Sequence, residues 1–199
     1  MSRYRAKILP MNSAFLSSTV NGLESCRKVA ITTINGFDGW KCICMEDFGA
    51  DPEDPLEKCL ARLRTCNLFV GILGHRYGSV HPNGKSYTEL EYDEACKLGI
   101  NCLMFLASVD FLISIDERES DELHEKQKEF RLRVANHTGH FIEDFANSDR
   151  LGTALARAIA NQVIKDIDGG GSDQKDTWLM VAFVTNQVGF GHWDHRDQP

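Results

Sequence analysis

The sequence lacks the features that mark membrane and secreted proteins. No stretch approaches the roughly 18 consecutive apolar residues of a membrane span, and residues 1–10 carry charges without the apolar centre of a signal peptide. We therefore expect a protein that has no membrane partner and stays in the cytoplasm.

Basic residues are also too few for a nucleic-acid binder. The chain of 199 residues has 22 Lys and Arg against 29 Asp and Glu, which gives a net charge of -7. A surface that binds the phosphate backbone needs clustered Lys and Arg. The sequence thus predicts no nucleic-acid partner.

The cysteines form no recognisable metal motif. There are seven of them, with no CxxC pair and no histidine at a zinc-like spacing, at positions 26, 42, 44, 59, 66, 96 and 102. An odd number of scattered cysteines indicates reduced, mostly buried thiols. We expect no metal site and no disulfide framework.

Several common catalytic motifs are missing as well. The chain contains no Walker loop, no GxSxG elbow, no HExxH and no dinucleotide-binding GxGxxG. The usual NTPase, hydrolase and dehydrogenase interpretations have no local support, and we expect no bound cofactor.

What the sequence does have is a regular alternation of strand and helix patterns. Short apolar runs predict strands at 13–19, 40–45, 68–73, 101–107 and 139–145, and helical periodicity predicts helices at 23–34, 56–66, 88–98, 119–136 and 150–166. Such alternation favours a parallel sheet covered on both faces. We predict an α/β fold: a flavodoxin-like, three-layer, doubly wound parallel sheet of about five strands.

The pattern also sets the expected domain limits. With 42% apolar residues the chain has the composition of one compact domain, which we place at residues 13–167. The glycine-rich run at 169–172 is typical of a flexible linker, and an apolar patch follows at 177–184. Residues 168–199 are predicted to be a linker and tail of unassigned role.

The fold class indicates where a ligand would bind. In open parallel sheets, ligands lie outside the carboxyl ends of the strands, where loops and helix N-termini converge. Four segments occupy that edge in the predicted fold: 17–19, 46–48, 74–79 and 86–91.

The hydroxyls and the arginine of these segments suit a nucleotide. Ser17, Ser18 and Thr19 offer hydroxyls to a ribose or phosphate, although such residues are also ordinary turn and cap residues. Arg76 has a planar guanidinium suited to a diphosphate. The alternative for Arg76 is a mobile surface loop in which it pairs with Glu46 or Asp47.

Two carboxylates lie near the start of the helix at 88–98. Glu89 and Glu91 are two residues apart and so face different directions, and either is stabilised by the positive end of the helix dipole. Glu91 shares a face with Tyr87, and Ala95 permits close packing one turn later. We predict Glu91 as the ligand-facing carboxylate, with Glu89 as runner-up.

Read together, several segments resemble a known domain family: 15–19, 45–48, 54–57, 66–74, 76–78 and 86–92. The family is TIR-like and of unknown function. Its domain usually lies N-terminal to a STAND-type NTPase and a set of sequence repeats, in larger signalling or defence proteins. The resemblance covers about residues 13 to 165. The family is in turn similar, more distantly, to TIR domains and to nucleoside deoxyribosyltransferases.

This resemblance implies an activity. In both relatives a glutamate near a helix start lies beside the ribose, and an alanine follows four residues later, as Ala95 follows Glu91. It implies a catalytic Glu91 in an NAD or nucleotide glycohydrolase, an NAD(P)+ nucleosidase, that acts in signalling or antiviral defence and is activated by assembly. NAD or another nucleotide is then a substrate, bound by Ser17, Ser18, Thr19, Asp47, Phe48, Gly74, Arg76, Tyr77, Ser86 and Tyr87.

Two other functions remain open at this stage. One is a non-catalytic module that oligomerises or binds a separate signalling NTPase or sensor protein, and it needs no carboxylate in a pocket. The other is transfer of a base between nucleosides, which requires a covalent glutamate nucleophile and a deep base pocket.

Overall fold

The computed structural model describes residues 12–45, 55–114 and 118–169. Strands and helices alternate strictly along these residues, in the predicted order. The elements are β1 (Asn12–Ser18), α1 (Glu24–Asn35), β2 (Trp40–Ile43), α2 (Pro55–Leu63), β3 (Leu68–Leu73), α3 (Tyr87–Leu98), β4 (Asn101–Ala107), α4 (Asp121–Ala135), β5 (Phe141–Phe145) and α5 (Ser148–Gly169).

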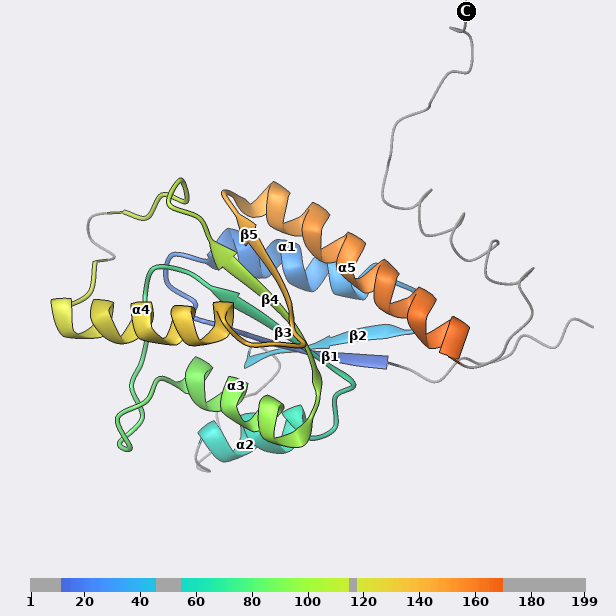
Figure 1. The fold of residues 1–199 in the computed structure, drawn as a ribbon, viewed down its shortest axis with the longest axis horizontal. Coiled ribbons are helices and arrows are strands. Elements are labelled where there is room, and N and C mark those ends of the chain that lie inside the picture. The colour runs from blue at the N-terminus through green and yellow to red at the C-terminus, as the bar shows by residue number, and fades with distance from the viewer. Residues whose placement is uncertain (1–11, 46–54, 115–117, 170–199) are drawn as a thin grey trace, which may run out of the picture. The chain divides into compact units, whose positions relative to one another are not determined.

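The five strands form one parallel sheet in the order β2-β1-β3-β4-β5 (Figure 1). This order is that of flavodoxin, in which the chain winds first to one side of β1 and then to the other. The α/β, flavodoxin-like prediction is confirmed. The central strand β3 has six buried residues, as expected for a strand covered on both faces.

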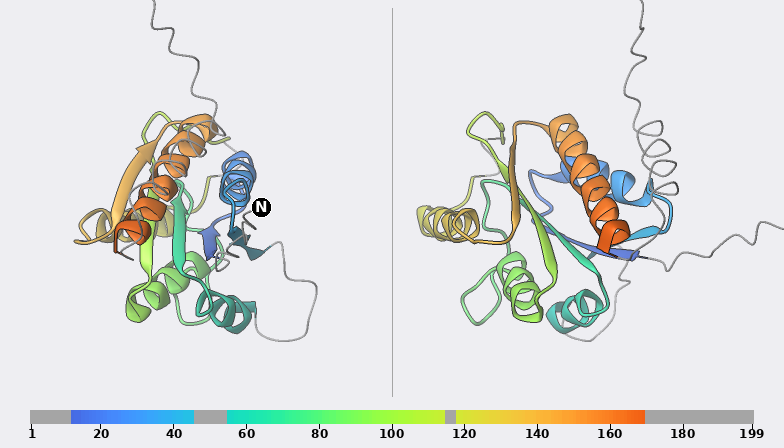
Figure 2. Two further views of the ribbon diagram at one scale, coloured as in Figure 1. Left: turned by 90° about the vertical axis from the view of Figure 1, so that its right-hand side faces the viewer. Right: turned by 45° about the vertical axis from the view of Figure 1, so that its right-hand side comes forward.

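Helices cover both faces of the sheet (Figures 1 and 2). Side chains alternate along each strand, so Phe15 and Phe69 point to the face covered by α2, α3 and α4, and they pack there with Tyr92 and Phe130. The helix α1 lies on the opposite face, where its buried Ala30 and further apolar side chains are directed. The sheet therefore holds α3 between its two neighbours α2 and α4.

Two glycines close the turns that matter for the site. Gly99 ends α3 in the left-handed conformation, with φ of 68°, so that β4 begins two residues later. Gly78 has φ of 84° in the loop between β3 and α3. Both turns follow the glycine positions expected from the sequence.

Several predicted boundaries shift by one to three residues, and two of these shifts have a visible cause. The helix expected from residue 119 begins at Asp121, because the Ser120 hydroxyl caps it by accepting a hydrogen bond from the Leu123 N–H. This leaves Glu119 outside the helix. The strand expected from residue 139 begins at Phe141, since Gly139 has φ of 95° in the preceding turn.

The chain divides into two compact units, Met1–Leu155 and Ala156–Pro199, and the division falls within α5. The sheet and α1–α4 belong to the first unit. In that unit α5 starts against α1, with Gly152 facing Val29. None of the helices described is long and apolar enough to cross a membrane. The predicted tail, 168–199, lies beyond the described residues apart from the end of α5.

Candidate functional site

The predicted site lies where β1 and β3 end and α3 begins. The loop between β3 and α3 returns the chain so that the first turns of α3 stand beside the last residues of β1. Ser86 is the N-cap of α3, and its hydroxyl accepts a hydrogen bond from the Glu89 N–H at 3.2 Å. Glu91 follows in the second turn of the helix.

Glu91 is enclosed at this edge. Glu91 is only 5% exposed and Ser17 only 1%. The Ser17 hydroxyl donates a hydrogen bond to Glu91 Oε2 at 2.5 Å. The Cys59 thiol of α2 forms a second side-chain hydrogen bond with the same carboxyl group. Glu91 is therefore held by one group from β1 and one from α2.

Burial raises the pKa of Glu91 to about 7, against the hydrogen bonds from Ser17 and Cys59 and the positive charge of Arg27, which all lower it. A carboxyl group with this pKa exchanges its proton near neutrality and can act as acid or base. Burial also raises the pKa of the Cys59 thiol to about 12, so Cys59 remains a hydrogen-bond donor.

Ser18 points to the other face of β1 and does not join Glu91. Arg27 of α1 donates to Ser18 Oγ at 2.6 Å and to the Ser18 carbonyl at 3.3 Å. Arg27 itself is 3% exposed. Sequence reasoning missed this buried arginine; the signal was its place beside Cys26 on the apolar face of a helix.

Thr19 reaches the same edge from the end of β1. Its Oγ1 is buried and has no hydrogen-bond partner among the described residues. Its Cγ2 lies close to Gly78, where a Cβ would come within 2.5 Å. The strand end and the loop after β3 are thus in direct contact.

The loop after β3 holds a carboxylate of the chain itself. The backbone N–H groups of Tyr77 and Gly78 donate to Glu119 at 2.6 and 3.0 Å, and Arg76 Nη2 lies 3.5 Å from Glu119 Oε1. Two N–H groups and a guanidinium around one carboxylate are an anion-binding arrangement. Glu119 was not singled out from the sequence, which placed it in an exposed helix.

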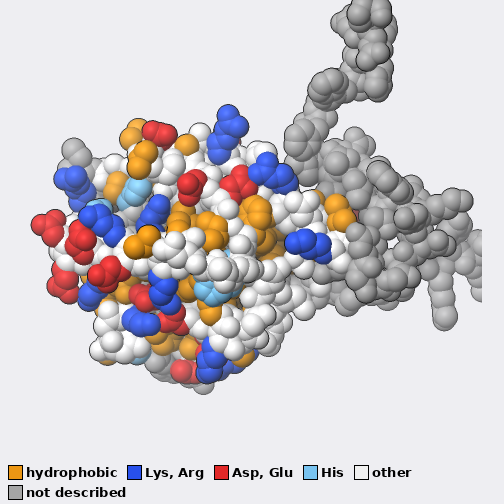
Figure 3. Space-filling model, viewed as in Figure 1, with side chains coloured by type: hydrophobic (Ala, Val, Ile, Leu, Met, Phe, Trp, Pro, Cys, Tyr) orange, Lys and Arg blue, Asp and Glu red, His pale blue; other side chains and the backbone are white. Residues whose placement is uncertain are grey.

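Glu89, the runner-up, belongs to an ion-pair network on the outer side of α3. It accepts hydrogen bonds from the Tyr77 hydroxyl and from Arg133 Nη2, the latter at 2.7 Å, and Lys85 lies 3.5 Å away. Arg133 and Lys85 also bind Asp93. Figure 3 shows acidic and basic side chains side by side over this α3–α4 region. These contacts give Glu89 a structural role.

Two further predicted residues, Gly74 and Tyr87, lie at the same edge. The Gly74 carbonyl accepts hydrogen bonds from Gln127 and Arg131 of α4, at 2.7 and 3.0 Å. Tyr87 meets the His81 ring edge-to-face at 5.8 Å between centroids. Asp47 and Phe48 lie outside the described residues.

Comparison with known proteins identifies a family but no activity. A family model described as "Domain of unknown function (DUF4062)" matches residues 13–160. No curated protein matches the chain. Among solved structures, the crystal structure of oxidised flavodoxin 1 from Bacillus cereus matches with 10% sequence identity and a TM-score of 0.31, covering 92% of this chain and 100% of flavodoxin.

Proposed function

Since the chain belongs to the DUF4062 family, a domain family of unknown function, we propose its function from the geometry around Glu91. The protein is an NAD or nucleotide glycohydrolase that cleaves an N-glycosidic bond and becomes active on assembly. Glu91 is the catalytic carboxylate. The observation that carries this proposal is a buried carboxyl group with a pKa of about 7 at the carboxyl edge of the sheet.

The reaction suits one well-placed carboxylate. When the bond between the ribose C1′ and the base nitrogen breaks, nicotinamide leaves NAD as a neutral base and takes the bonding electrons. Positive charge then develops on the ribose, and a carboxylate beside it stabilises the transition state. Water adds to C1′ and gives its proton to Glu91, which returns it to solvent.

Ser17 positions the carboxylate for this role. Its hydroxyl donates to Oε2 and lowers the pKa of Glu91, which favours the ionised form that the reaction needs. Thr19 supplies a further buried hydroxyl oxygen at the same edge, without a partner among the described residues. Both suit contacts with ribose hydroxyls.

The loop after β3 suits the diphosphate of the same substrate. The Tyr77 and Gly78 N–H groups and Arg76 bind the Glu119 carboxylate in this structure. A diphosphate offers the same kind of acceptor with more charge. Substrate binding therefore requires the displacement of Glu119.

Activation by assembly agrees with the burial of the site. Glu91 and Ser17 are 5% and 1% exposed, so a substrate reaches them only after the covering side chains move. Contact with a second copy, or with a separate signalling NTPase or sensor protein, is the proposed cause of that movement. This proposal includes a TIR-like relationship and a place in cytoplasmic signalling or antiviral defence. The seven free cysteines suit the reducing conditions of the cytoplasm.

The experiment measures release of free base. The full chain is incubated, dilute and then concentrated or crowded, with NAD, NADP, ATP and nucleosides, and the products are separated by chromatography. We expect release that rises with protein concentration and is abolished in Glu91→Gln. Glu89→Gln is the matched control, two residues away on the same helix, and is expected to retain activity. Unchanged turnover in Glu91→Gln would refute the assignment.

A second candidate function is favoured by the same burial. A non-catalytic module that associates with itself or a partner needs no accessible carboxylate, and Glu91 then only joins α3 to β1 and α2. This function predicts no base release at any concentration. It also predicts that surface substitutions abolish assembly while Glu91→Gln does not.

A further inference from the structure

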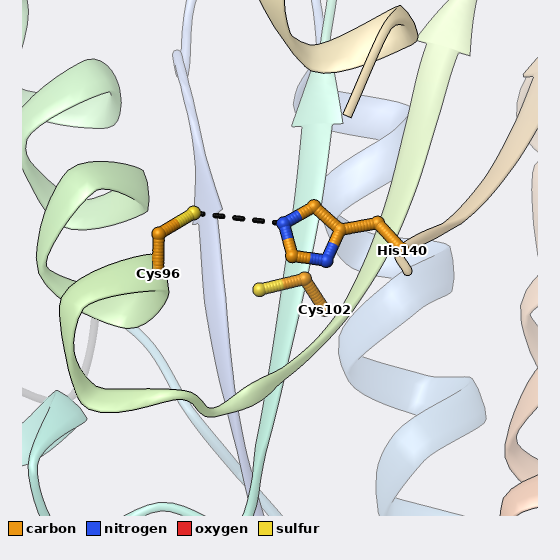
Figure 4. Close-up of side chains that lie close together, drawn as sticks. All are labelled: Cys96, Cys102 and His140. Atoms are coloured by element: carbon orange, nitrogen blue, oxygen red, sulfur yellow. Dashed lines mark hydrogen bonds between the residues drawn. The ribbon is translucent and has the colours of Figure 1, made fainter. Parts of the chain in front are cut away.

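Two cysteines and a histidine meet at the end of the molecule away from Glu91 (Figure 4). Cys96 lies in the last turn of α3, Cys102 is the second residue of β4, and His140 immediately precedes β5. The strands are parallel, so the starts of β4 and β5 lie at the opposite edge of the sheet from the ends of β1 and β3. The cluster is thus independent of the proposed function.

The turn at Gly99 brings the two cysteines together. Its left-handed conformation reverses the chain between α3 and β4, and the Ile100 N–H bonds back to the Ala95 carbonyl at 3.0 Å. His140, one residue before β5, then lies beside Cys102, because β4 and β5 are paired with Leu103 opposite Phe141. Spacing along the sequence does not reveal this meeting.

The ligand atoms are at metal-binding separations. One ligand atom from each of Cys96, Cys102 and His140 lies within 4.8 Å of the other two. The Cys96 Sγ to His140 Nε2 distance is 3.5 Å. Bonds of about 2.3 Å to sulfur and about 2.0 Å to nitrogen, at a tetrahedral angle, place two such atoms roughly 3.5 Å apart.

The surroundings favour an ion with affinity for sulfur. Cys102 is fully buried, whereas Cys96 and His140 are half-buried and leave an approach from solvent. The His140 ring stacks on the His137 ring at 3.7 Å between centroids, and an imidazole nitrogen is a common metal ligand.

A buried hydroxyl beside the cluster supports the same conclusion. Tyr92 is 1% exposed, and its hydroxyl interacts with the Cys96 thiol, although the two form no hydrogen bond of normal geometry. Cys96 and Cys102 are among its nearest ionisable neighbours, and its ring meets His140 edge-to-face at 5.7 Å between centroids. Two thiols, an imidazole and this hydroxyl therefore meet in one largely buried place, and the polar character of that place suits a bound cation.

We propose that Cys96, Cys102 and His140 bind one thiophilic metal ion, Zn²⁺ in the first instance, with a fourth position left for another ligand. Binding forms two metal–sulfur bonds and one metal–nitrogen bond, and the two thiol protons pass to solvent. The ion joins the end of α3 to the starts of β4 and β5. This departs from the expectation of no metal site, which rested on the spacing of cysteines and histidines along the sequence.

The test uses the full chain, reduced and stripped of metal with a chelator. Zn²⁺ is titrated in competition with a chromophoric chelator, and Co²⁺ is used separately for its thiolate charge-transfer and tetrahedral d–d absorption. We expect one Zn²⁺ per chain at this site, with affinity reduced roughly 100-fold or more in Cys96→Ser and in His140→Gln. Both substituted side chains are half-buried, so folding is checked by circular dichroism.

Two control variants separate this cluster from other ligands of the chain. Cys66→Ser alters a cysteine whose thiol donates to the Arg62 carbonyl, a bond that serine can reproduce. A double variant, His192→Ala with His195→Ala, removes the histidines of the tail. Both are expected to bind as the unaltered chain does.

The proposal is overturned if the reduced chain takes up no Zn²⁺ at micromolar concentration, or if folded Cys96→Ser and His140→Gln bind it unchanged. It is also overturned if the two cysteines form a disulfide and no Zn²⁺ is bound after reduction. A rise of about 5 °C in the unfolding midpoint at 100-fold excess of Zn²⁺ over its dissociation constant, absent in Cys96→Ser, supports it.

Discussion

The hydroxyl of Ser17 donates to the carboxylate of Glu91 at 2.5 Å, across 74 residues of sequence. This bond joins the end of β1 to the second turn of α3, and both partners are buried. Burial opposes the charge of Glu91, and the bond from Ser17 favours it. The balance between the two produces the first two predictions.

The first prediction concerns stability against pH. The pKa of Glu91 is about 7 in the folded chain against an ordinary value of 4.5. The folded state therefore keeps a proton that the unfolded state has lost, and the contribution of Glu91 to stability falls as pH rises from 4.5 to 7. Ionised Glu91 weakens the fold by about 3 kcal/mol above pH 7, relative to an unshifted carboxyl.

Glu91→Gln removes this dependence and keeps an oxygen that accepts from Ser17. Denaturant unfolding of both proteins between pH 4.5 and 7.5 checks it, with the difference in free energy of unfolding as the measure. We expect the free energy of unfolding of the variant to rise, relative to that of the unaltered chain, as the pH increases across that range. If the free energies of unfolding of the two proteins change with pH in the same way, the raised pKa of Glu91 is contradicted.

The second prediction concerns Ser17→Ala. Loss of the donated hydrogen bond removes a group that lowers the pKa of Glu91, so this pKa rises further. If the glycohydrolase proposal holds, the rising limb of the pH–rate profile moves to higher pH and turnover at pH 7 falls. Ser18→Ala is the matched control, because Ser18 bonds to Arg27 on the other face of β1. A shift of equal size in both variants is inconsistent with the geometry.

The third prediction concerns Glu119. Glu119→Gln weakens the contacts with the Tyr77 and Gly78 N–H groups and with Arg76 by removing the charge. Inorganic diphosphate then meets less competition, and we expect it to bind about 10-fold tighter, as the loss of one charge-assisted hydrogen bond implies. Isothermal titration calorimetry measures the dissociation constant of diphosphate for both proteins.

Glu125→Gln is the control for this effect. Glu125 lies on α4 and is exposed, where it pairs with Lys128 at 2.6 Å. Its substitution leaves diphosphate affinity unchanged if the anion binds at the loop after β3. Equal affinity of the Glu119→Gln variant and the unaltered chain would show that Glu119 does not occupy a phosphate site.

The fourth prediction concerns the contact between Thr19 and Gly78. Gly78→Ala puts a Cβ 2.5 Å from Thr19 Cγ2 on a residue with φ of 84°. We expect a loss of about 1–3 kcal/mol in the free energy of unfolding. Gly84→Ala separates strain from the clash, because Gly84 has φ of 91° and nothing within 4 Å. Guanidinium unfolding should show the larger loss for Gly78→Ala.

Much of the fold could be predicted because it depends on local pattern. The run Leu68–Leu73 is apolar throughout and becomes the central strand β3. Ser86 and Gly99 mark the start and the end of α3 as capping rules require. Right-handed crossovers and the alternation of elements then restrict the strand order to a few doubly wound arrangements, of which the flavodoxin-like order is one.

The candidate site was predictable only in part. Glu91 and Ser17 were selected from their places at the carboxyl edge, and the structure brings them together. The contact of Glu119 with the loop after β3 was not foreseen, because no pattern links residues 42 positions apart.

The sequence by itself determined the order of strands and helices, and with it the edge at which Glu91 lies, because periodicity and capping act over a few residues. Tertiary structure alone decided which groups meet: Arg27 with Ser18, Glu119 with the Gly78 N–H, and Cys96 with His140. These meetings depend on how neighbouring strands pair and how helices pack against them. Burial, and with it the raised pKa of Glu91, is a property of that packing.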